Sequence, residues 1–335
     1  MDIKNFESLE KSYIYSQAYL DRIKDELPAI MKDLREYICV IAVGSYGRSE
    51  AAKDVSDFEW ITVYDETSVS VEEARCCQAE LTGYFANVFG REFLSINKTF
   101  GEICSISDLS TNVGGEADTN RTLTYRMLVL AEGVALTDNR CYEKIIKSLA
   151  STYGSSFTAG HRLLSLATDI ARYWRTLRID YKFKVDEGKK PWAVRSMKLR
   201  SSRRMWYLAS AMHFVALAPR IDYTQTRTFN VDDVADYMRT MGGNPVIRIL
   251  KSAKKIGANI AELQELLDLY NNIQDALNNK ELRDYLNTLD GSYRFDDEKY
   301  EAVHKQCVTL HRTAAELIIA LPEDPRRQFL EMFLL

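Results

Sequence analysis

The chain has 335 residues, 46% of them hydrophobic, and a formal net charge of -4 at pH 7. This length and apolar content are enough to bury a large core in two or three domains. The slightly acidic balance excludes a protein that binds polyanions over its whole surface. No apolar run approaches the roughly 20 residues that a membrane-spanning helix needs, and the segment after Met1, DIKNFESLEK, lacks the basic-then-apolar pattern of a signal peptide. We therefore expect a soluble, cytoplasmic protein.

The cysteines and histidines show no pattern typical of a zinc site or a disulfide framework. The six cysteines are scattered without ligand spacing, and the adjacent Cys76 and Cys77 point in different directions on a predicted helix. We expect them to be reduced and mostly buried. We expect structural or surface roles for all four histidines, His161, His213, His304 and His311. The chain also lacks a nucleophile-histidine-acid constellation and a long P-loop, which argues against a hydrolase and a P-loop kinase.

The first elements in chain order are a helical segment and two apolar strands. The first thirty-odd residues are predicted to be helical, with Pro28 at the first turn of a helix that runs to about Tyr37. YICVIAV, residues 37–43, is a continuous apolar run typical of a strand covered on both faces. FEWITVY, residues 58–64, is its predicted neighbour in the sheet.

A helix and two short strand candidates follow. The helix opens at Ser70, whose side chain and the acids after it form a cap, and it ends at Gly90. EFLSI at residues 92–96 and EICSI at residues 102–106 have the composition of short strands. The chain up to about residue 115 therefore predicts a mixed α/β domain.

Beyond Gly114 and Gly115 the strand pattern nearly vanishes. Apolar residues recur at helical spacing in most of the remaining chain. We predict helices over residues 120–133, 161–185, 193–217, 231–241, 258–278 and 298–320. Gly242, Gly243 and Pro245 are expected to terminate the fourth of these helices. The sequence thus predicts an α/β domain over residues 1–120 and an all-helical domain over residues 121–335.

Two acids at the start of the second strand break its apolar pattern. Asp57 and Glu59 have one residue between them, so in a strand both project from the same face. Mg²⁺ is typically held by one or two carboxylates together with waters and substrate phosphates. Gly44 and Ser45 follow the first strand directly. A glycine lets backbone N–H groups approach a phosphate closely, the serine hydroxyl adds a donor, and Arg48 adds a charge. These residues predict a metal and phosphate site; the alternative is a plain loop and an edge strand with solvent-facing acids.

The stretch that holds these residues resembles a known family. VGSYGRSEAAKDVSDFEW looks like the signature of the DNA polymerase β-like nucleotidyltransferase superfamily: glycine-serine after a strand, a spacer, then acid-hydrophobic-acid on the next strand. Its form is most similar to bacterial nucleotidyltransferases related to the uridylyltransferase branch. DIARYWRTLRIDYKFK and KPWAVRSMKLRSSRRMWY are similar to the helical region of the same group, so the resemblance spans about residues 35–215.

The resemblance implies a fold and a reaction. The fold would be an α/β (α+β) nucleotidyltransferase core with a small mixed sheet, followed by an all-helical C-terminal domain. Asp57 and Glu59 would bind Mg²⁺ or Mn²⁺, and Gly44 and Ser45 would contact the phosphates of a nucleoside triphosphate such as ATP. Arg48 would be an auxiliary phosphate-binding or loop-ordering residue. The reaction would transfer a nucleoside monophosphate to a hydroxyl of a protein, an RNA or a small molecule, with release of pyrophosphate.

The chain departs from the family pattern at two of the three expected carboxylates. Glu59 stands where Asp is the commoner residue. The third carboxylate, which lies on a further strand in active members, is expected to be Glu102 because that residue begins an apolar, strand-like run. The alternatives are Asp108, Glu116 and Asp118. If none of them serves, the fold is a catalytically silent nucleotide- or RNA-binding module; a protein-interaction scaffold is a third hypothesis.

A basic segment lies in the predicted helical domain. From Arg162 to Arg204 the chain carries thirteen basic residues against four acidic ones, a charge of +9 in a protein of net charge -4. Such a concentration of positive charge attracts a triphosphate or the end of a nucleic acid. The residues expected to bind phosphate are Arg172, Arg175, Lys198 and Arg203. The alternative is a solvated surface on which lysines and arginines cover apolar neighbours.

Overall fold

The protein divides into two compact units, each assembled from separate stretches of the chain. The computed structural model describes residues 1–96, 100, 102–111, 113–137, 140–155, 163–186, 191–219, 230–289 and 296–334. Residues 13–166 and 218–244 form the sheet unit, and residues 1–12, 167–217 and 245–335 form the helical unit. The boundary expected between residues 120 and 121 therefore lies inside the sheet unit.

The sheet unit contains one small mixed sheet. Within the described residues its strands are β1 (Ile38–Val43), β2 (Glu59–Tyr64), β3 (Ile103–Ser105) and β4 (Val134–Ala135), in the order β3-β2-β1-β4. β1 is antiparallel to β2 and β4, whereas β2 and β3 are parallel. The register places Val43 opposite Glu59. The end of β1 and the start of β2 therefore meet at one edge of the sheet.

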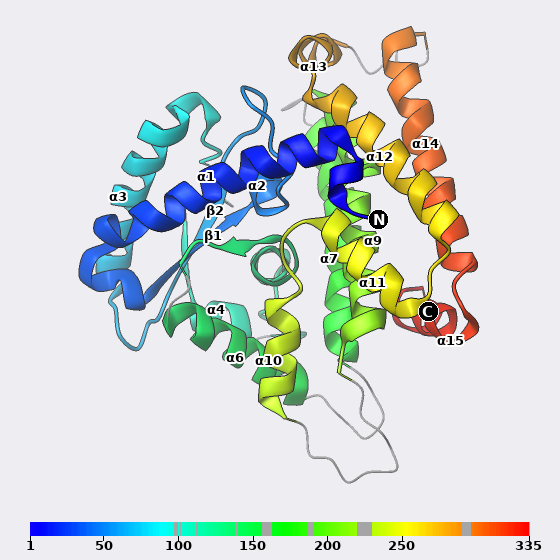
Figure 1. Ribbon diagram of the computed structural model, residues 1–335. Coiled ribbons are helices and arrows are strands. Elements are labelled where there is room, and N and C mark those ends of the chain that lie inside the picture. The colour runs from blue at the N-terminus through cyan, green and yellow to red at the C-terminus, as the bar shows by residue number, and fades with distance from the viewer. Residues whose placement is uncertain are drawn as a thin grey trace, which may run out of the picture. The chain divides into compact units, whose positions relative to one another are not determined.

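Helices surround the sheet (Figure 1). Those of the sheet unit are most of α1 (Glu7–Met31), then α2 (Gly44–Gly47), α3 (Val71–Phe89), α4 (Ile106–Ser110), α5 (Asn120–Met127), α6 (Arg140–Ser155) and α10 (Val231–Arg239). The structure confirms an α+β core with a small mixed sheet, together with a region built of helices.

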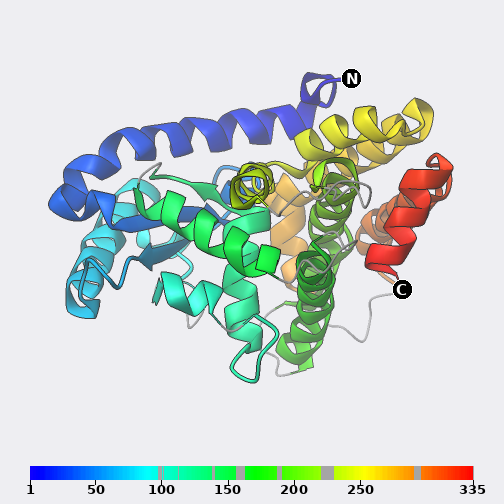
Figure 2. The same cartoon turned by 90° about the horizontal axis from the view of Figure 1, so that it is seen from below.

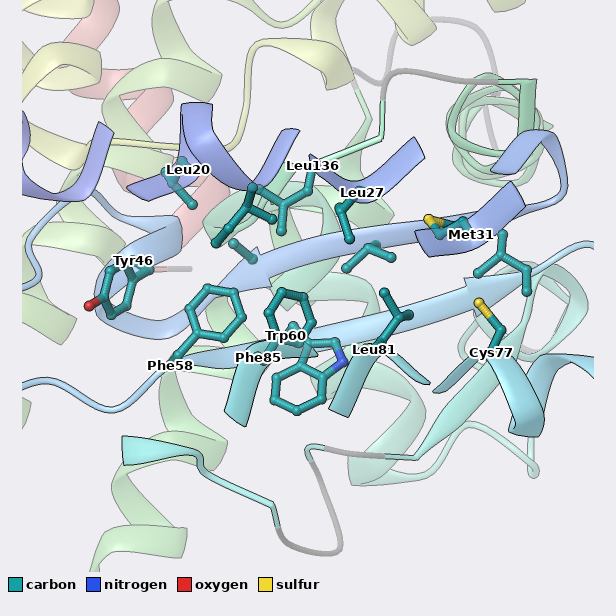
Figure 3. Packing of buried hydrophobic residues seen from close by; sticks show 14 of the residues in the cluster. Leu20, Leu27, Met31, Tyr46, Phe58, Trp60, Cys77, Leu81, Phe85 and Leu136 are labelled. Carbon is teal, nitrogen blue, oxygen red and sulfur yellow. The ribbon is translucent and has the colours of Figure 1, made fainter. Parts of the chain in front are cut away.

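A hydrophobic core lies between one face of the sheet and helices α1 and α3 (Figure 3). Phe58 and Trp60 are fully buried in this core, as are Leu27 of α1 and Phe85 of α3. Because side chains alternate along a strand, the burial of Phe58 and Trp60 turns their neighbours Asp57 and Glu59 to the opposite face. Every residue of β1 is buried, which confirms that this strand is covered on both faces.

Two predicted elements of the sheet unit need correction. Pro28 does not begin a helix: it lies inside α1, and a 3₁₀ helix, Lys32–Glu36, follows. The buried side chains of Leu27 and Met31 keep this helix on the core past the proline, which outweighs the hydrogen bond that the proline lacks. EFLSI forms a 3₁₀ turn and a single bridge rather than a strand.

The helical unit consists of most of α7 and seven further helices in the part of the chain that is described. They are α7 (Leu164–Asp186), α8 (Trp192–Arg200), α9 (Ser202–Leu217), α11 (Pro245–Ile256), α12 (Ile260–Asn278), α13 (Lys280–Asn287), α14 (Glu298–Ile319) and α15 (Glu323–Phe333). In Figure 2 the last two, orange and red, lie side by side. Residues 193–217 are two helices interrupted at Ser201, not one. Pro245 begins α11, a position that suits proline.

None of the described helices combines the length and the apolar composition that crossing a membrane requires.

Candidate functional site

The candidate site is the turn that follows β1, together with the start of β2. Gly44 has φ +66°, in the left-handed region that glycine adopts without steric cost. A Cβ atom at Gly44 would overlap with the Glu59 carboxylate, which lies directly against this glycine. The close approach follows from the strand register, since Glu59 is opposite Val43. Gly44 is therefore required both by its backbone conformation and by the acid beside it.

Two polar side chains of this site are left for a ligand. Asp57 is exposed, and it makes no hydrogen bond or ion pair to any residue that the structure describes. The Ser45 hydroxyl is half-buried and likewise has no hydrogen bond to a described residue. Tyr46, the residue after Ser45, is buried. Burial raises the pKa of its phenol far above the usual value, so it stays neutral. Asp57 and Ser45 are thus polar groups of the site that a ligand can reach.

A buried ion-pair network holds the turn from behind. Arg48 is only 5% exposed; its Nε lies 2.8 Å from Glu50 Oε2 and its Nη1 lies 2.9 Å from Glu132 Oε1. The same Glu132 oxygen accepts a 2.8 Å hydrogen bond from the Gly44 N–H. Buried charges persist when they are paired in this way. Of the two roles expected for Arg48, the structure supports loop ordering, and the Gly44 N–H is no longer available to a phosphate.

Other segments brace the same turn. The Asn244 side chain donates to the Arg48 carbonyl at 3.0 Å, and the Ala51 N–H donates to Ser16 Oγ of α1 at 3.0 Å. A Cβ at Gly47 would lie 2.6 Å from the Ala42 carbonyl oxygen, so no larger residue fits there. The turn is therefore fixed from several sides.

The turn also holds strained backbone. Ser49 and Asp54 both adopt positive φ angles, 53° and 56°. Non-glycine residues in this region cost free energy and persist only where the surroundings fix them. This strain lies between the glycine turn and the two acids, which is where a preorganised ligand site would store it.

The four candidates for a third carboxylate have different environments. Glu102 comes directly before β3, which is the strand next to β2, and its exposed carboxylate pairs with Arg121. Asp108 caps α4 by exchanging hydrogen bonds with Ser105. Asp118 forms a buried ion pair with Arg126 at 2.9 Å. Glu116 is exposed in the loop before α5. Asp108 is exposed but its side chain caps α4, and Asp118 is used in a buried ion pair, so Glu102 and Glu116 remain as the exposed candidates that do not cap a helix.

The sheet register gives Glu102 a further relation to the acid pair. Ile103 lies opposite Thr62, which places Glu102 beside Ile61, and alternation then puts Glu102 on the same face as Glu59. In the described part of the chain, however, no group of three or more His, Cys, Asp or Glu side chains is close enough to hold a metal ion. Glu102 thus shares a face with the pair without joining it in one cluster.

The donor chemistry of Asp57 and Glu59 fits a hard cation. Two carboxylates on one face supply the one or two protein ligands that Mg²⁺ usually takes, with water and phosphate oxygens as the rest. Asp57 is exposed and makes no hydrogen bond or ion pair to a described residue. Glu59 lies against Gly44, which has no side chain to overlap with the carboxylate. These two residues are the ones that would hold Mg²⁺ or Mn²⁺.

The expected phosphate-binding residues of the basic segment belong to the helical unit, whereas Asp57 and Glu59 belong to the sheet unit. Arg172 pairs with the buried Asp169 at 2.8 Å. Arg175 is exposed on α7, and Lys198 and Arg203 are half-buried. Several residues of the predicted segment and one histidine lie outside the described residues, or have side chains that do: His161, Arg162, Lys184, Asp186, Glu187, Lys189 and Lys190.

Glu132 is the site residue that the sequence interpretation missed. It is fully buried at the end of a π-helical segment, Leu128–Glu132, that continues α5. The available signal was a single acid at the end of the apolar run LVLAEG. A charged residue in such a run is rarely buried unless it has a partner, and the partner here is Arg48.

The chain was compared with protein-family models, with curated proteins and with solved structures, and no match was found in any of the three.

Proposed function

We propose that the protein is a metal-dependent nucleotidyltransferase, which transfers a nucleoside monophosphate from a nucleoside triphosphate to a hydroxyl acceptor and releases pyrophosphate. The observation that carries this proposal is the contact between the Glu59 carboxylate and Gly44, with Asp57 exposed on the same face. It joins the two halves of the motif, the glycine turn and the acid pair, in one place. If the turn were a plain surface loop unrelated to the acids, no acid side chain would require a glycine in it. Here a Cβ atom at Gly44 would overlap with the Glu59 carboxylate.

In this proposal each residue of the turn has a distinct task. Asp57 and Glu59 hold the divalent cation, which when bound neutralises phosphate charge and favours departure of pyrophosphate. The Ser45 hydroxyl donates a hydrogen bond to a phosphate oxygen of the triphosphate. Gly44 keeps the chain clear of Glu59, and the Arg48, Glu50 and Glu132 network fixes the turn before the ligand arrives. Such prior positioning avoids an ordering cost at the moment of reaction.

The third carboxylate would take the proton of the acceptor hydroxyl. Glu102 suits this task because it precedes the strand next to β2 and faces the same side as Glu59. Its present partner is Arg121, so the carboxylate has to leave that ion pair before it can accept a proton. An exposed ion pair contributes little free energy, so its release costs little.

The test is a transfer assay with each nucleoside triphosphate labelled at the α-phosphate, Mg²⁺, and cell RNA or lysate proteins as acceptors. We expect label on one acceptor class, reduced about a hundredfold or more by Asp57→Asn. Asp54→Asn is the matched control, since it removes an exposed acid of the same loop and asparagine tolerates its positive φ. Equal transfer by the two variants would exclude the proposed role of Asp57.

A second function, a catalytically silent nucleotide- or RNA-binding module, is favoured by two observations. Glu102 is paired with Arg121, and the described residues contain no group of three metal-ligating side chains. This function predicts that the protein binds a triphosphate in the presence of Mg²⁺ but transfers no label to any acceptor. Binding that persists in Asp57→Asn without transfer by the wild type would favour it.

A further inference from the structure

Three arginines of the helical unit gather around an aromatic pair. The Arg204 guanidinium of α9 lies over the Trp174 ring of α7, 6.0 Å from its centroid, and Trp174 stacks on Tyr207 with centroids 5.3 Å apart. Arg178 is four residues after Trp174, so it projects from the same face of α7. Arg200 ends α8, just before α9 begins. We call Arg178, Arg200 and Arg204 the arginine cluster.

The arginine cluster has no acidic partner in the described part of the chain. None of its three side chains forms an ion pair there, and the buried Nε of Arg204 has no hydrogen-bond partner. Besides Trp174 of α7, Arg204 contacts His311 of α14, which brings no negative charge. Burial, together with the charges of Arg178 and Arg200, lowers the pKa of Arg204 to about 10. Like charges therefore face one another, and no carboxylate that the structure describes pairs with them.

This arrangement differs from the other basic residues of the same segment. Arg172 of α7 has its own carboxylate, Asp169, at 2.8 Å. Within the described residues Arg172 is paired internally whereas three neighbouring arginines have no acid, so their positive charge is available to an external anion. Arg178 and Arg200 are exposed, so an anion can reach the cluster from solvent.

We propose that the arginine cluster binds a phosphate group. Guanidinium groups present N–H donors in pairs that match two oxygens of a phosphate, and three of them can satisfy a doubly charged group. One face of the Trp174 ring is covered by Tyr207 and Arg204 also lies on this ring, so the site recognises phosphate rather than a stacked base. The phosphate group comes from a free polyphosphate or from the backbone of an RNA. The proposal does not depend on transfer activity at Asp57 and Glu59.

The test measures binding without divalent cations, in EDTA, so that a metal-dependent site contributes nothing. Inorganic triphosphate is titrated into the full-length protein by calorimetry, and a fluorescent single-stranded RNA is titrated by anisotropy over a range of salt concentrations. The test variant is Arg178→Gln with Arg200→Gln, two exposed positions. The matched control is Lys254→Gln with Lys255→Gln, which removes two exposed charges from α11 of the same unit.

We expect the arginine variant to weaken binding about tenfold or more, because each charge-assisted hydrogen bond that it removes is a strong one. The lysine variant should bind as the wild type does. Arg204→Lys, which keeps the charge but not the paired donors, should also weaken binding. If RNA is the source, the salt dependence of its affinity should become shallower by about 0.7 for each phosphate that the variant no longer neutralises; an effect on triphosphate alone identifies a free polyphosphate. Equal weakening by the arginine and lysine variants, or no binding of either probe, would overturn the proposal.

Discussion

Arg48 of the sheet unit is buried and Arg204 of the helical unit is half-buried, and their surroundings are opposite. Arg48 has a carboxylate on each side, Glu50 at 2.8 Å and Glu132 at 2.9 Å. Arg204 has an indole ring, an imidazole and two further arginines near it. The first guanidinium is fully neutralised by its own chain. The charge of the second is offset, in our proposal, by a phosphate group from outside the chain.

The difference shows how the same residue type serves two purposes. A buried arginine that is paired on both sides fixes backbone, and here it fixes the turn that carries Gly44 and Ser45. Arg204 is held by aromatic neighbours and by no acid that the structure describes, so its charge is left for an anionic ligand to offset. The two proposals are separate for the same reason: the sheet unit would do chemistry through carboxylates, and the helical unit would bind phosphate through guanidinium groups.

The largest effect should come from removing the buried carboxylate that serves both the arginine and the turn. Glu132→Ala leaves Arg48 with one acid and leaves the Gly44 N–H without an acceptor. We expect the free energy of unfolding of the sheet unit to fall by about 3–5 kcal/mol, as for other broken buried ion pairs. Hydrogen exchange of the β1 amides measures this unit separately from the helical one.

Two variants sharpen that measurement. Glu132→Gln keeps an acceptor for the Gly44 N–H and loses only the charge, so it should cost less than Glu132→Ala. Glu102→Ala removes an acid whose ion pair is exposed, and β1 exchange should barely change. If Glu132→Ala were as mild as Glu102→Ala, the Arg48 network would not be what holds the turn.

A smaller effect is expected at Gly44, where backbone conformation and side-chain contact add. Gly44→Ala should cost about 3 kcal/mol, of which about 1–2 kcal/mol comes from the left-handed backbone and the rest from overlap with Glu59. In a Glu59→Ala background the overlap is gone, so Gly44→Ala should cost about 1–2 kcal/mol less there. Urea unfolding of the four proteins in this cycle gives both numbers.

Gly83 of α3 is the matched control for this cycle. A Cβ atom at Gly83 would meet nothing within 4 Å, and the residue lies inside a helix. Gly83→Ala should therefore stabilise the protein by about 0.5–1 kcal/mol. A cost of Gly44→Ala that stays the same with and without Glu59 would show that the acid does not lie against the turn.

The motif was readable from sequence because its parts are close in the chain. Gly44, Ser45, Asp57 and Glu59 fall within sixteen residues, and the period of a strand predicts that the two acids share a face. Their placement after β1 and at the start of β2 agrees with this prediction. Glu132 and Asn244 reach the same turn from positions 88 and 196 residues away from their partners, and no local pattern encodes such contacts.

The fold was predictable where one residue property dominated. The buried strand at residues 38–43 and the capped helix after Ser70 both appeared as predicted, because continuous apolar runs and capping residues act locally. The strand β4 has two residues and is formed by pairing with β1, so its own sequence gives little signal. Pro28 misled because proline is common at the start of a helix, whereas here the apolar residues on either side of it decided the outcome.

A third prediction concerns the pH dependence of stability that comes from His213 of α9, in the helical unit. Burial lowers its pKa to about 3, with smaller contributions from Arg248, Lys251 and Lys255 of α11. The unfolded chain takes up this proton near pH 6.5, whereas the folded protein does not until about pH 3, so stability falls as the pH drops below 6.5. The loss should be about 1.4 kcal/mol per pH unit, or roughly 2 kcal/mol between about pH 6.5 and 5.

His213→Asn isolates this contribution. The variant cannot take up the proton, so its free energy of unfolding should fall less steeply over the same pH range than that of the wild type. Urea unfolding at several pH values measures both slopes. Parallel slopes would mean that His213 is protonated in the folded protein, and the helical unit would then tolerate more buried positive charge than the lowered pKa indicates.

The smallest effect on stability is expected at Glu102. Substitution of this residue tests the proposed mechanism most directly. Glu102→Gln and Arg121→Gln each break one exposed ion pair, so both should leave the free energy of unfolding within about 0.5 kcal/mol of the wild type. Their effects on transfer should differ. If Glu102 accepts the proton of the acceptor hydroxyl, Glu102→Gln should lower transfer about a hundredfold, whereas Arg121→Gln frees the carboxylate and should not lower it. Equal rates in the two variants would place the third carboxylate elsewhere, and Glu116→Gln, at the other exposed candidate that does not cap a helix, is then the variant to assay.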